Sequence, residues 1–89
     1  MRDRYLEITF RKGKPFAAYL YLPRAPGVKS LHTEKAGNGL LIDYGESGQP
    51  IGIEITAPKQ INADVLNAVL TRLNIRPVEP GEVSPLIAA

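Results

Sequence analysis

The sequence predicts one α+β domain: a four-stranded antiparallel β-meander, one C-terminal helix packed on a sheet face, and an extended proline-rich tail. Three observations lead to this fold class. Apolar and polar residues alternate through the first two thirds of the chain, which is typical of half-buried strands. Apolar residues then recur at helical spacing, and prolines gather near the C-terminus. We expect a compact domain over residues 1–74 and a tail over residues 75–89.

The first predicted hairpin joins residues 4–11 to residues 16–22. Alternate positions of both strands are apolar, so the two apolar sets can face one another on one side of the hairpin. The connecting segment 12–15 has turn chemistry, because Gly13 tolerates positive φ and Pro15 has no N–H for a ladder.

The second predicted hairpin, residues 39–56, has the clearest pattern in the chain. Pairing Ile42 with Ile53 brings all the alternating apolar residues onto one face, whereas a slip of one residue would turn one strand's set to solvent. The segment 36–39 before it is a strong turn signal. Residues 29–35 show the weakest strand pattern. The six apolar residues are Leu40, Ile42, Tyr44, Ile51, Ile53 and Ile55, and the opposite face carries Asp43, Gly52, Glu54 and Thr56.

A helix is expected after the second hairpin. Asn62 is a suitable N-cap, and Asp64 in the first turn favours the helix dipole. Asn74 can end the helix, and the tail beyond it contains three prolines. The apolar stripe of this helix, which we interpret as core, consists of Val65, Leu66, Val69, Leu70 and Leu73.

Composition narrows the class of protein. The chain has 89 residues and no cysteine, which excludes disulfide scaffolds and thiolate metal sites. The N-terminal residues have no apolar segment of the signal-peptide type, and no apolar run approaches the ~20 residues of a membrane span. We expect a cytoplasmic protein without a membrane segment. Because a domain this small has a thin core, self-association as a homodimer is a common supplement.

Charge is unevenly distributed although the net charge is only +2. Residues 1–35 hold eight Lys or Arg against three Asp or Glu, a balance of +5, and residues 36–89 have a balance of −3. This polarity is compatible with complementary packing between neighbouring elements or protomers, and also with an anionic partner.

Three of the four tyrosines, Tyr5, Tyr19 and Tyr21, fall on the polar face of the first hairpin around Glu7 and Thr9. Tyrosine combines a large apolar ring with a polar tip, so such a face suits an interface with a second copy or a protein partner. Ordinary cross-strand pairing on a solvated face and a second core layer under the tail are the alternatives.

Nucleic-acid binding is the other function that the first hairpin suggests. Arg11, Lys12 and Lys14 flank its turn, and basic side chains among aromatic ones are used by single-strand binders. Glu7 in the middle of the tyrosine face and the low net charge argue against it.

Catalytic, cofactor and metal motifs are not expected. His32 and Glu34 share a face at strand spacing, but a metal site or an acid–base pair needs further groups, for which only Asp43 and Glu54 are candidates. The serines lack a nucleophile-elbow setting, and the glycines are spaced for a hairpin rather than a phosphate loop. We expect a protein that is not an enzyme and has no cofactor.

Three stretches carry a family resemblance: residues 16–22, residues 32–34, and residues 39–55, which read Gly-Leu-Leu-Ile-Asp-Tyr-Gly-Glu-Ser-Gly-Gln-Pro-Ile-Gly-Ile-Glu-Ile. The segment from Tyr5 to Ala57 resembles the domain-of-unknown-function family 2283. The resemblance implies a compact strand-rich fold and a bacterial or archaeal source, with no established activity or catalytic residues. An antitoxin-like partner role is suggested by analogy with members beside toxin-like genes. The chain departs from the family at segment 12–15, typically acidic, and carries an apparent insertion around residues 24–28.

Overall fold

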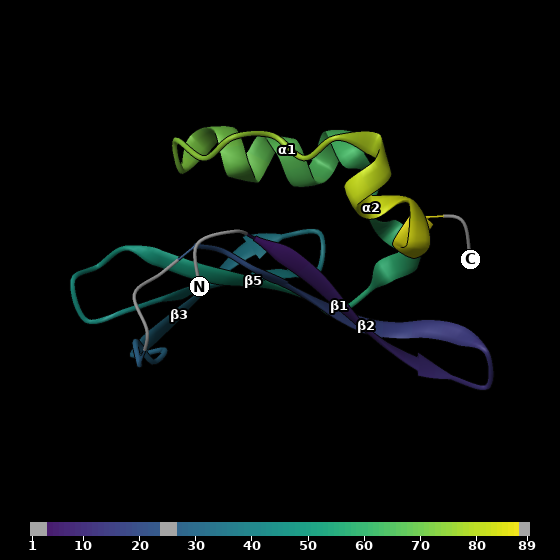
Figure 1. Cartoon of the computed structure of the whole chain (residues 1–89), viewed down its shortest axis with the longest axis horizontal. Coiled ribbons are helices and arrows are strands. Elements are labelled where there is room, and N and C mark those ends of the chain that lie inside the picture. The colour runs from purple at the N-terminus through teal and green to yellow at the C-terminus, as the bar shows by residue number, and fades with distance from the viewer. Residues whose placement is uncertain (1–3, 24–26, 88–89) are drawn as a thin grey trace.

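The computed structural model describes residues 4–23 and 27–87 and has two layers, a five-stranded sheet and helices on one of its faces (Figure 1). The strands are β1 (Tyr5–Arg11), β2 (Lys14–Tyr21), β3 (His32–Gly37), β4 (Leu40–Tyr44) and β5 (Pro50–Ile55). A short 3-10 helix, η1 (Pro58–Gln60), leads to the helices α1 (Ala63–Arg72) and α2 (Pro80–Ile87). The α+β class is confirmed.

The strand order is β1-β2-β5-β4-β3, with every neighbouring pair antiparallel. The prediction of a four-stranded meander is therefore wrong in two respects. The weak pattern before the second hairpin does form a strand, β3, and β2 pairs with β5 instead of with its successor in sequence.

Polarity explains why β3 lies at the edge of the sheet. Its sequence, His-Thr-Glu-Lys-Ala-Gly, is almost entirely exposed. In a meander β3 would lie between β2 and β4, and alternate polar side chains of β3 would face the core at the centre of the sheet. Pairing β2 with β5 instead places two apolar strands at the centre and leaves a charged strand at the edge, which also discourages edge-to-edge association.

The hairpin registers follow the apolar pattern. Leu40 pairs with Ile55 and Ile42 with Ile53, as predicted. Tyr44 pairs with Pro50 rather than with Ile51, because a register shift follows Asp43. The first hairpin is closed by a two-residue turn, Lys12 and Gly13, whose φ values of 52° and 78° match the turn type that suits twisted hairpins.

Helix α1 begins and ends as the sequence predicts. The Asn62 side chain accepts a hydrogen bond of 2.9 Å from the Val65 N–H, which caps the N-terminus. Asn74 follows the helix with a φ of 61°, a left-handed conformation that ends helices. No helix within the described ranges has the length and apolar character needed to cross a membrane.

The prediction of an extended tail is wrong, because residues 80–87 form α2. Pro80 occupies the first helical position, where its missing N–H costs nothing. The Glu82 carboxylate accepts a 2.9 Å hydrogen bond from the Glu79 N–H, which is half of a capping box. Pro85 removes one helical hydrogen bond, but the neighbouring Val83 and Leu86 are buried in the core.

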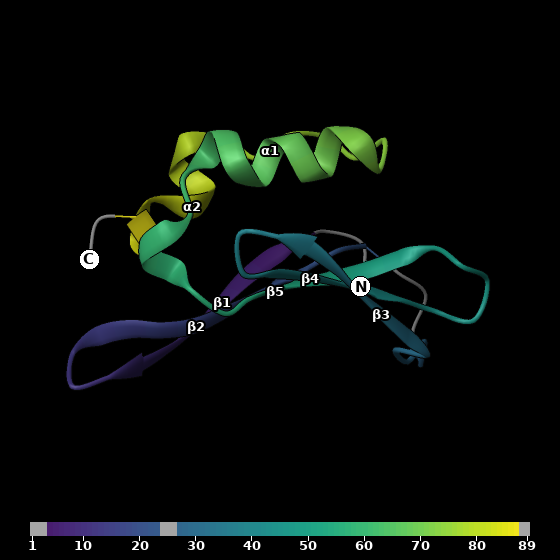
Figure 2. The same cartoon turned by 180° about the vertical axis from the view of Figure 1, so that it is seen from behind.

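The core lies between the helices and one face of the sheet, and the two helices leave the other face uncovered (Figures 1 and 2). Two rows of sheet residues form one side of it, and residues of the helical segments form the other. The buried core residues of the sheet are Ala18, Leu20, Leu40, Ile42, Ile53 and Ile55, and those of α1, α2 and the segment before α2 are Leu66, Val69, Leu70, Val78, Val83 and Leu86.

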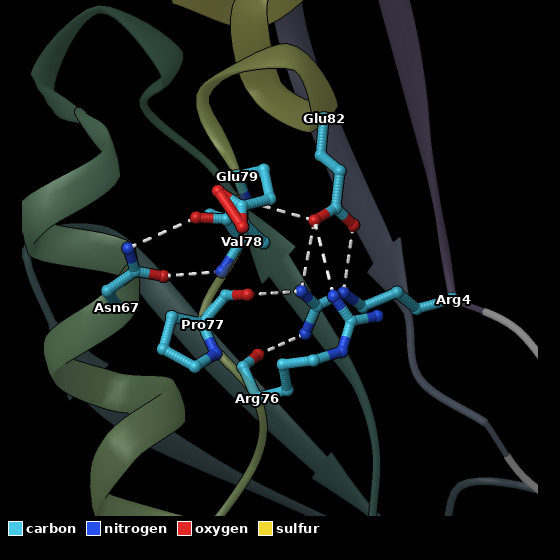
Figure 3. Close-up of polar contacts among 7 residues, drawn as sticks. All are labelled: Arg4, Asn67, Arg76, Pro77, Val78, Glu79 and Glu82. Carbon is cyan, nitrogen blue, oxygen red and sulfur yellow. Dashed lines mark hydrogen bonds and ion pairs between the residues drawn. The ribbon is translucent and has the colours of Figure 1, made fainter.

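A polar cluster attaches the C-terminal segment to the start of the sheet (Figure 3). The Arg4 side chain is only 3% exposed and binds the Glu82 carboxylate through its Nε, at 2.9 Å, and its Nη2, at 3.1 Å. It also donates to the main-chain carbonyls of residues 76 and 77. Asn67 on α1 hydrogen-bonds both main-chain groups of Val78. These contacts are structural, since they join three segments far apart in sequence.

Candidate interaction surfaces

On the face of the sheet opposite the helices, paired residues form two rows, and each row crosses all five strands. We call this surface the tyrosine face. Its first row, from β1 to β3, is Tyr5, Tyr21, Gly52, Asp43 and Thr33, and its second row is Glu7, Tyr19, Glu54, Leu41 and Lys35.

The three tyrosines form one aromatic cluster. The rings of Tyr5 and Tyr21 are stacked with centroids 4.5 Å apart, and Tyr19 meets Tyr21 edge-on at 4.7 Å. Both arrangements are favourable for aromatic pairs. Tyr5, on the edge strand, is 49% exposed, whereas Tyr19 and Tyr21 are half-buried. The sequence-based prediction that the three share a face is confirmed.

Gly52 allows the Tyr19 ring to cross the central strand. A Cβ atom at Gly52 would lie 2.0 Å from the Tyr19 hydroxyl oxygen, so the ring passes directly over the glycine. The hydroxyl donates a 2.7 Å hydrogen bond to Asp43 Oδ2 on the next strand. Thr33 donates to the other oxygen, Oδ1, at 2.6 Å. Asp43 is therefore held from both sides, and side chains of β2, β4 and β3 are linked across the central strand β5.

Glu7 is also part of this network, because the Tyr21 hydroxyl donates to its Oε1 at 3.1 Å. The carboxylate near the middle of the aromatic cluster thus orients a tyrosine. The tyrosine face is a pre-ordered aromatic surface with an acid at one end of its second row, Glu7, and a base at the other, Lys35.

A second surface lies at the tip of the first hairpin, and its origin is the unequal length of the central strands. Strand β5 ends at Ile55, opposite Ala18, so the beginning of β2 has no strand on that side. Residues 56–60 run there instead, and a groove of about 710 Å³ separates them from the hairpin tip. We call it the hairpin groove.

Four basic side chains line the hairpin groove: Arg11, Lys12 and Lys14 from the hairpin, and Lys59 from η1. Among the described residues, no Asp or Glu lines the groove. Phe16, also in the lining, is 53% exposed, and the Arg11 guanidinium lies 5.0 Å from the centre of its ring. Phe10, on the neighbouring strand, is 55% exposed.

His32 and Glu34 form an exposed pair on the edge strand, with His32 Nε2 and Glu34 Oε2 3.2 Å apart. They pair with Tyr44 and Ile42, so they lie on the opposite side of the sheet from Asp43 and Glu54. The additional groups that the sequence offered therefore do not converge on the histidine. Burial, aided by the nearby Glu34 carboxylate, raises the pKa of Tyr44. Within residues 4–23 and 27–87, no group of three or more potential metal-ligating side chains comes together.

The six residues proposed from sequence separate into two surfaces. Tyr5 pairs with Tyr21 at one end of the first hairpin, whereas Arg11 pairs with Lys14 at the other. The tyrosine face and the basic cluster are therefore different surfaces. Sequence reasoning missed Thr33 and Asp43 as partners of the tyrosines, and Lys59 as a neighbour of the basic turn, because sequence patterns do not show which strands are adjacent.

Comparison with known families agrees with the resemblance seen in the sequence. A family model described as "Protein of unknown function (DUF2283)" matches residues 17–57, a little under half of the chain. This segment of the chain resembles DUF2283. The match covers most of β2 and all of β3, β4 and β5, and includes the link between Tyr19, Gly52 and Asp43. Strand β1, both α-helices and most of the hairpin groove lie outside the DUF2283 match. Neither the curated proteins nor the solved structures contain a significant match.

Proposed function

We propose that the protein is a non-enzymatic interaction module that forms a homodimer through the tyrosine face. The observation that carries this proposal is the arrangement of the two rows, which is complementary to itself at every position except Glu54, which lies on the axis. An uncovered sheet face with ordered aromatic side chains also has the character of a protein interface, where tyrosines are enriched and cost little conformational entropy.

Self-complementarity follows from the position of β5 in the middle of the sheet. Two sheets can stack face to face about a two-fold axis parallel to β5, in the aligned packing of β-sandwiches. This operation places β1 of one copy over β3 of the other. Glu7 then faces Lys35 of the second copy, and Lys35 faces Glu7, so each dimer gains two opposite-charge contacts.

The same operation places aromatic rings against suitable groups. Tyr19 faces Leu41 of the second copy, Tyr21 faces Asp43, and Tyr5 faces Thr33. Five strands ~4.8 Å apart and about six residues in length give a face of roughly 500 Å². The dimer would bury about 1,000 Å² in total, near the lower limit for specific interfaces. A dissociation constant in the micromolar range is therefore expected.

The first test is the mass in solution by sedimentation velocity at tens of micromolar. The expected result is a species near twice 9.7 kDa that dissociates on dilution. A single-chain mass throughout this range, from a correctly folded sample, would refute the proposal.

Charge reversal tests the geometry of the dimer. Glu7→Lys and Lys35→Glu should each weaken dimerisation about tenfold, because each places two like charges opposite one another. The double variant should recover most of the affinity, because the pair is restored with its signs exchanged. Glu46→Lys and Lys29→Glu, exposed and outside the two rows, are matched controls and should leave the dissociation constant unchanged. If the double variant does not recover the dimer affinity, this two-fold axis is excluded.

A further inference from the structure

We propose that the hairpin groove binds single-stranded nucleic acid, with phosphates on its four cations and a base against Phe16. This site is at the far end of the first hairpin from Tyr5 and Tyr21, so it does not depend on dimerisation through the tyrosine face.

The electrostatic argument is that the groove concentrates positive charge without compensation. Across residues 4–23 and 27–87, no carboxylate forms an ion pair with the side chain of Arg11, Lys12, Lys14 or Lys59. None of the described acidic residues lines the groove. Four like charges around one groove repel each other, and a ligand that carries regularly spaced negative charge relieves this repulsion.

The aromatic argument concerns Phe16. Pro15 and a register shift between Thr9 and Phe10 displace this end of the hairpin from the regular ladder. Phe16 therefore stays half-exposed beside the groove while Ala18 and Leu20 enter the core. An exposed ring flanked by a guanidinium is what single-strand binders use, because bases stack on the ring and the cations hold the backbone.

The size of the groove favours a single strand. Its volume of about 710 Å³ lies in the range of sites for small ligands, so it accommodates a few nucleotides. A peptide of acidic residues alone, such as poly-glutamate, would satisfy the cations but has no apolar or aromatic group to cover the Phe16 ring. The combination of cations and Phe16 therefore selects nucleic acid over acidic protein as the occupant.

Fluorescence anisotropy with a labelled single-stranded oligonucleotide of mixed sequence, about 12 nucleotides long, tests the proposal at low salt. Binding should weaken with salt, with a slope of log affinity against log salt of about −3, because four phosphate contacts contribute roughly 0.7 each. No binding at low salt would overturn the proposal.

Lys59 supplies the sharpest variant, since it reaches the groove from an element more than forty residues away from the basic turn. Lys59→Gln should lower the affinity about three- to tenfold and make the salt slope shallower by about 0.7. The control, Lys29→Gln, removes the same charge from an exposed position outside the groove and should have little effect. If the two variants weaken binding equally, the binding is non-specific electrostatic attraction and the proposed site is refuted.

Phe16→Leu separates stacking from charge. An oligonucleotide with abasic sites keeps its phosphates but has no bases to stack, so it should bind the native protein several-fold more weakly. Phe16→Leu should abolish this preference, with its fold verified by circular dichroism. Tighter binding of a poly-glutamate peptide of equal charge would contradict the proposal and indicate an acidic protein partner.

Discussion

At the scale of single residues, the tyrosine face depends on one position without a side chain. The Tyr19 ring lies over Gly52 because no Cβ atom occupies that space, and its hydroxyl can then reach Asp43. The glycine does not have positive φ, so its role is to admit the ring and not to allow an unusual backbone. The Gly in the Ile-Gly-Ile-Glu-Ile segment thus has a physical purpose that the family pattern alone does not give.

We predict that Gly52→Ala lowers the free energy of unfolding by about 1–3 kcal/mol, because the new methyl group displaces Tyr19 from Asp43. Urea denaturation measures this cost. In a Tyr19→Ala background the ring is absent, so Gly52→Ala should cost much less, and a double-mutant cycle gives the coupling. Equal costs in the two backgrounds would show that the ring is not the obstacle.

At the scale of elements, α2 shows how contacts with neighbouring segments can stabilise a helix where the proline content favours an extended chain. Prolines at three positions predicted an extended tail, but Pro80 occupies the helical position where proline is tolerated best. Burial of Val83 and Leu86 and the bond from Arg4 to Glu82 then stabilise a helix that is too short to persist alone.

The pKa of Glu82 makes this attachment depend on pH. Its hydrogen bond with Arg4 lowers the pKa to about 2 from the ordinary 4.5, against the opposing effect of burial. A lowered pKa in the folded state contributes stability that is fully present above pH 4.5 and is lost as the pH falls toward 2.

We predict that Glu82→Gln lowers the free energy of unfolding at pH 7 by about 1–2 kcal/mol, a value reduced for the partial exposure of this carboxylate. The difference between native protein and variant should shrink as the pH is lowered from 4.5 toward 2. Urea denaturation of both proteins at several pH values measures it. Glu79→Gln, which removes an exposed carboxylate from the same segment, is the matched control. A difference that stays constant with pH would contradict the assignment.

At the scale of the whole molecule, the strand order creates surfaces that neither hairpin has alone. The pairing of β2 with β5 joins the tyrosines of the first hairpin to Asp43 and Glu54 of the second, and makes β5 the central strand. The two-fold axis that we propose, parallel to that strand, would place Glu54 opposite the same residue of the second copy.

We predict that Glu54→Gln strengthens dimerisation several-fold, because it removes two carboxylates that face each other across the axis. Sedimentation equilibrium measures the dissociation constant. Glu46→Gln removes the same charge from an exposed position off the tyrosine face and should not change it. Weaker dimerisation of Glu54→Gln would indicate a different arrangement of the two copies.

The sequence by itself determined the features that depend on nearby residues. Alternation placed Tyr5, Tyr19 and Tyr21 on one face, set the pairing of Ile42 with Ile53, and marked Asn62 as the start of the helix. These follow from strand and helix periods and from capping, which act over a few residues.

Only the tertiary structure decided which segments became neighbours. It placed β2 beside β5, moved the polar β3 to the edge, turned the proline-rich end into α2, and brought Lys59 to the basic turn. The physical reason is that burial of the apolar strands is a property of the whole sheet. The strand order depends on the total apolar area that the sheet buries and on how many charged side chains stay exposed to solvent. Both quantities involve the whole chain, so no local sequence pattern encodes them.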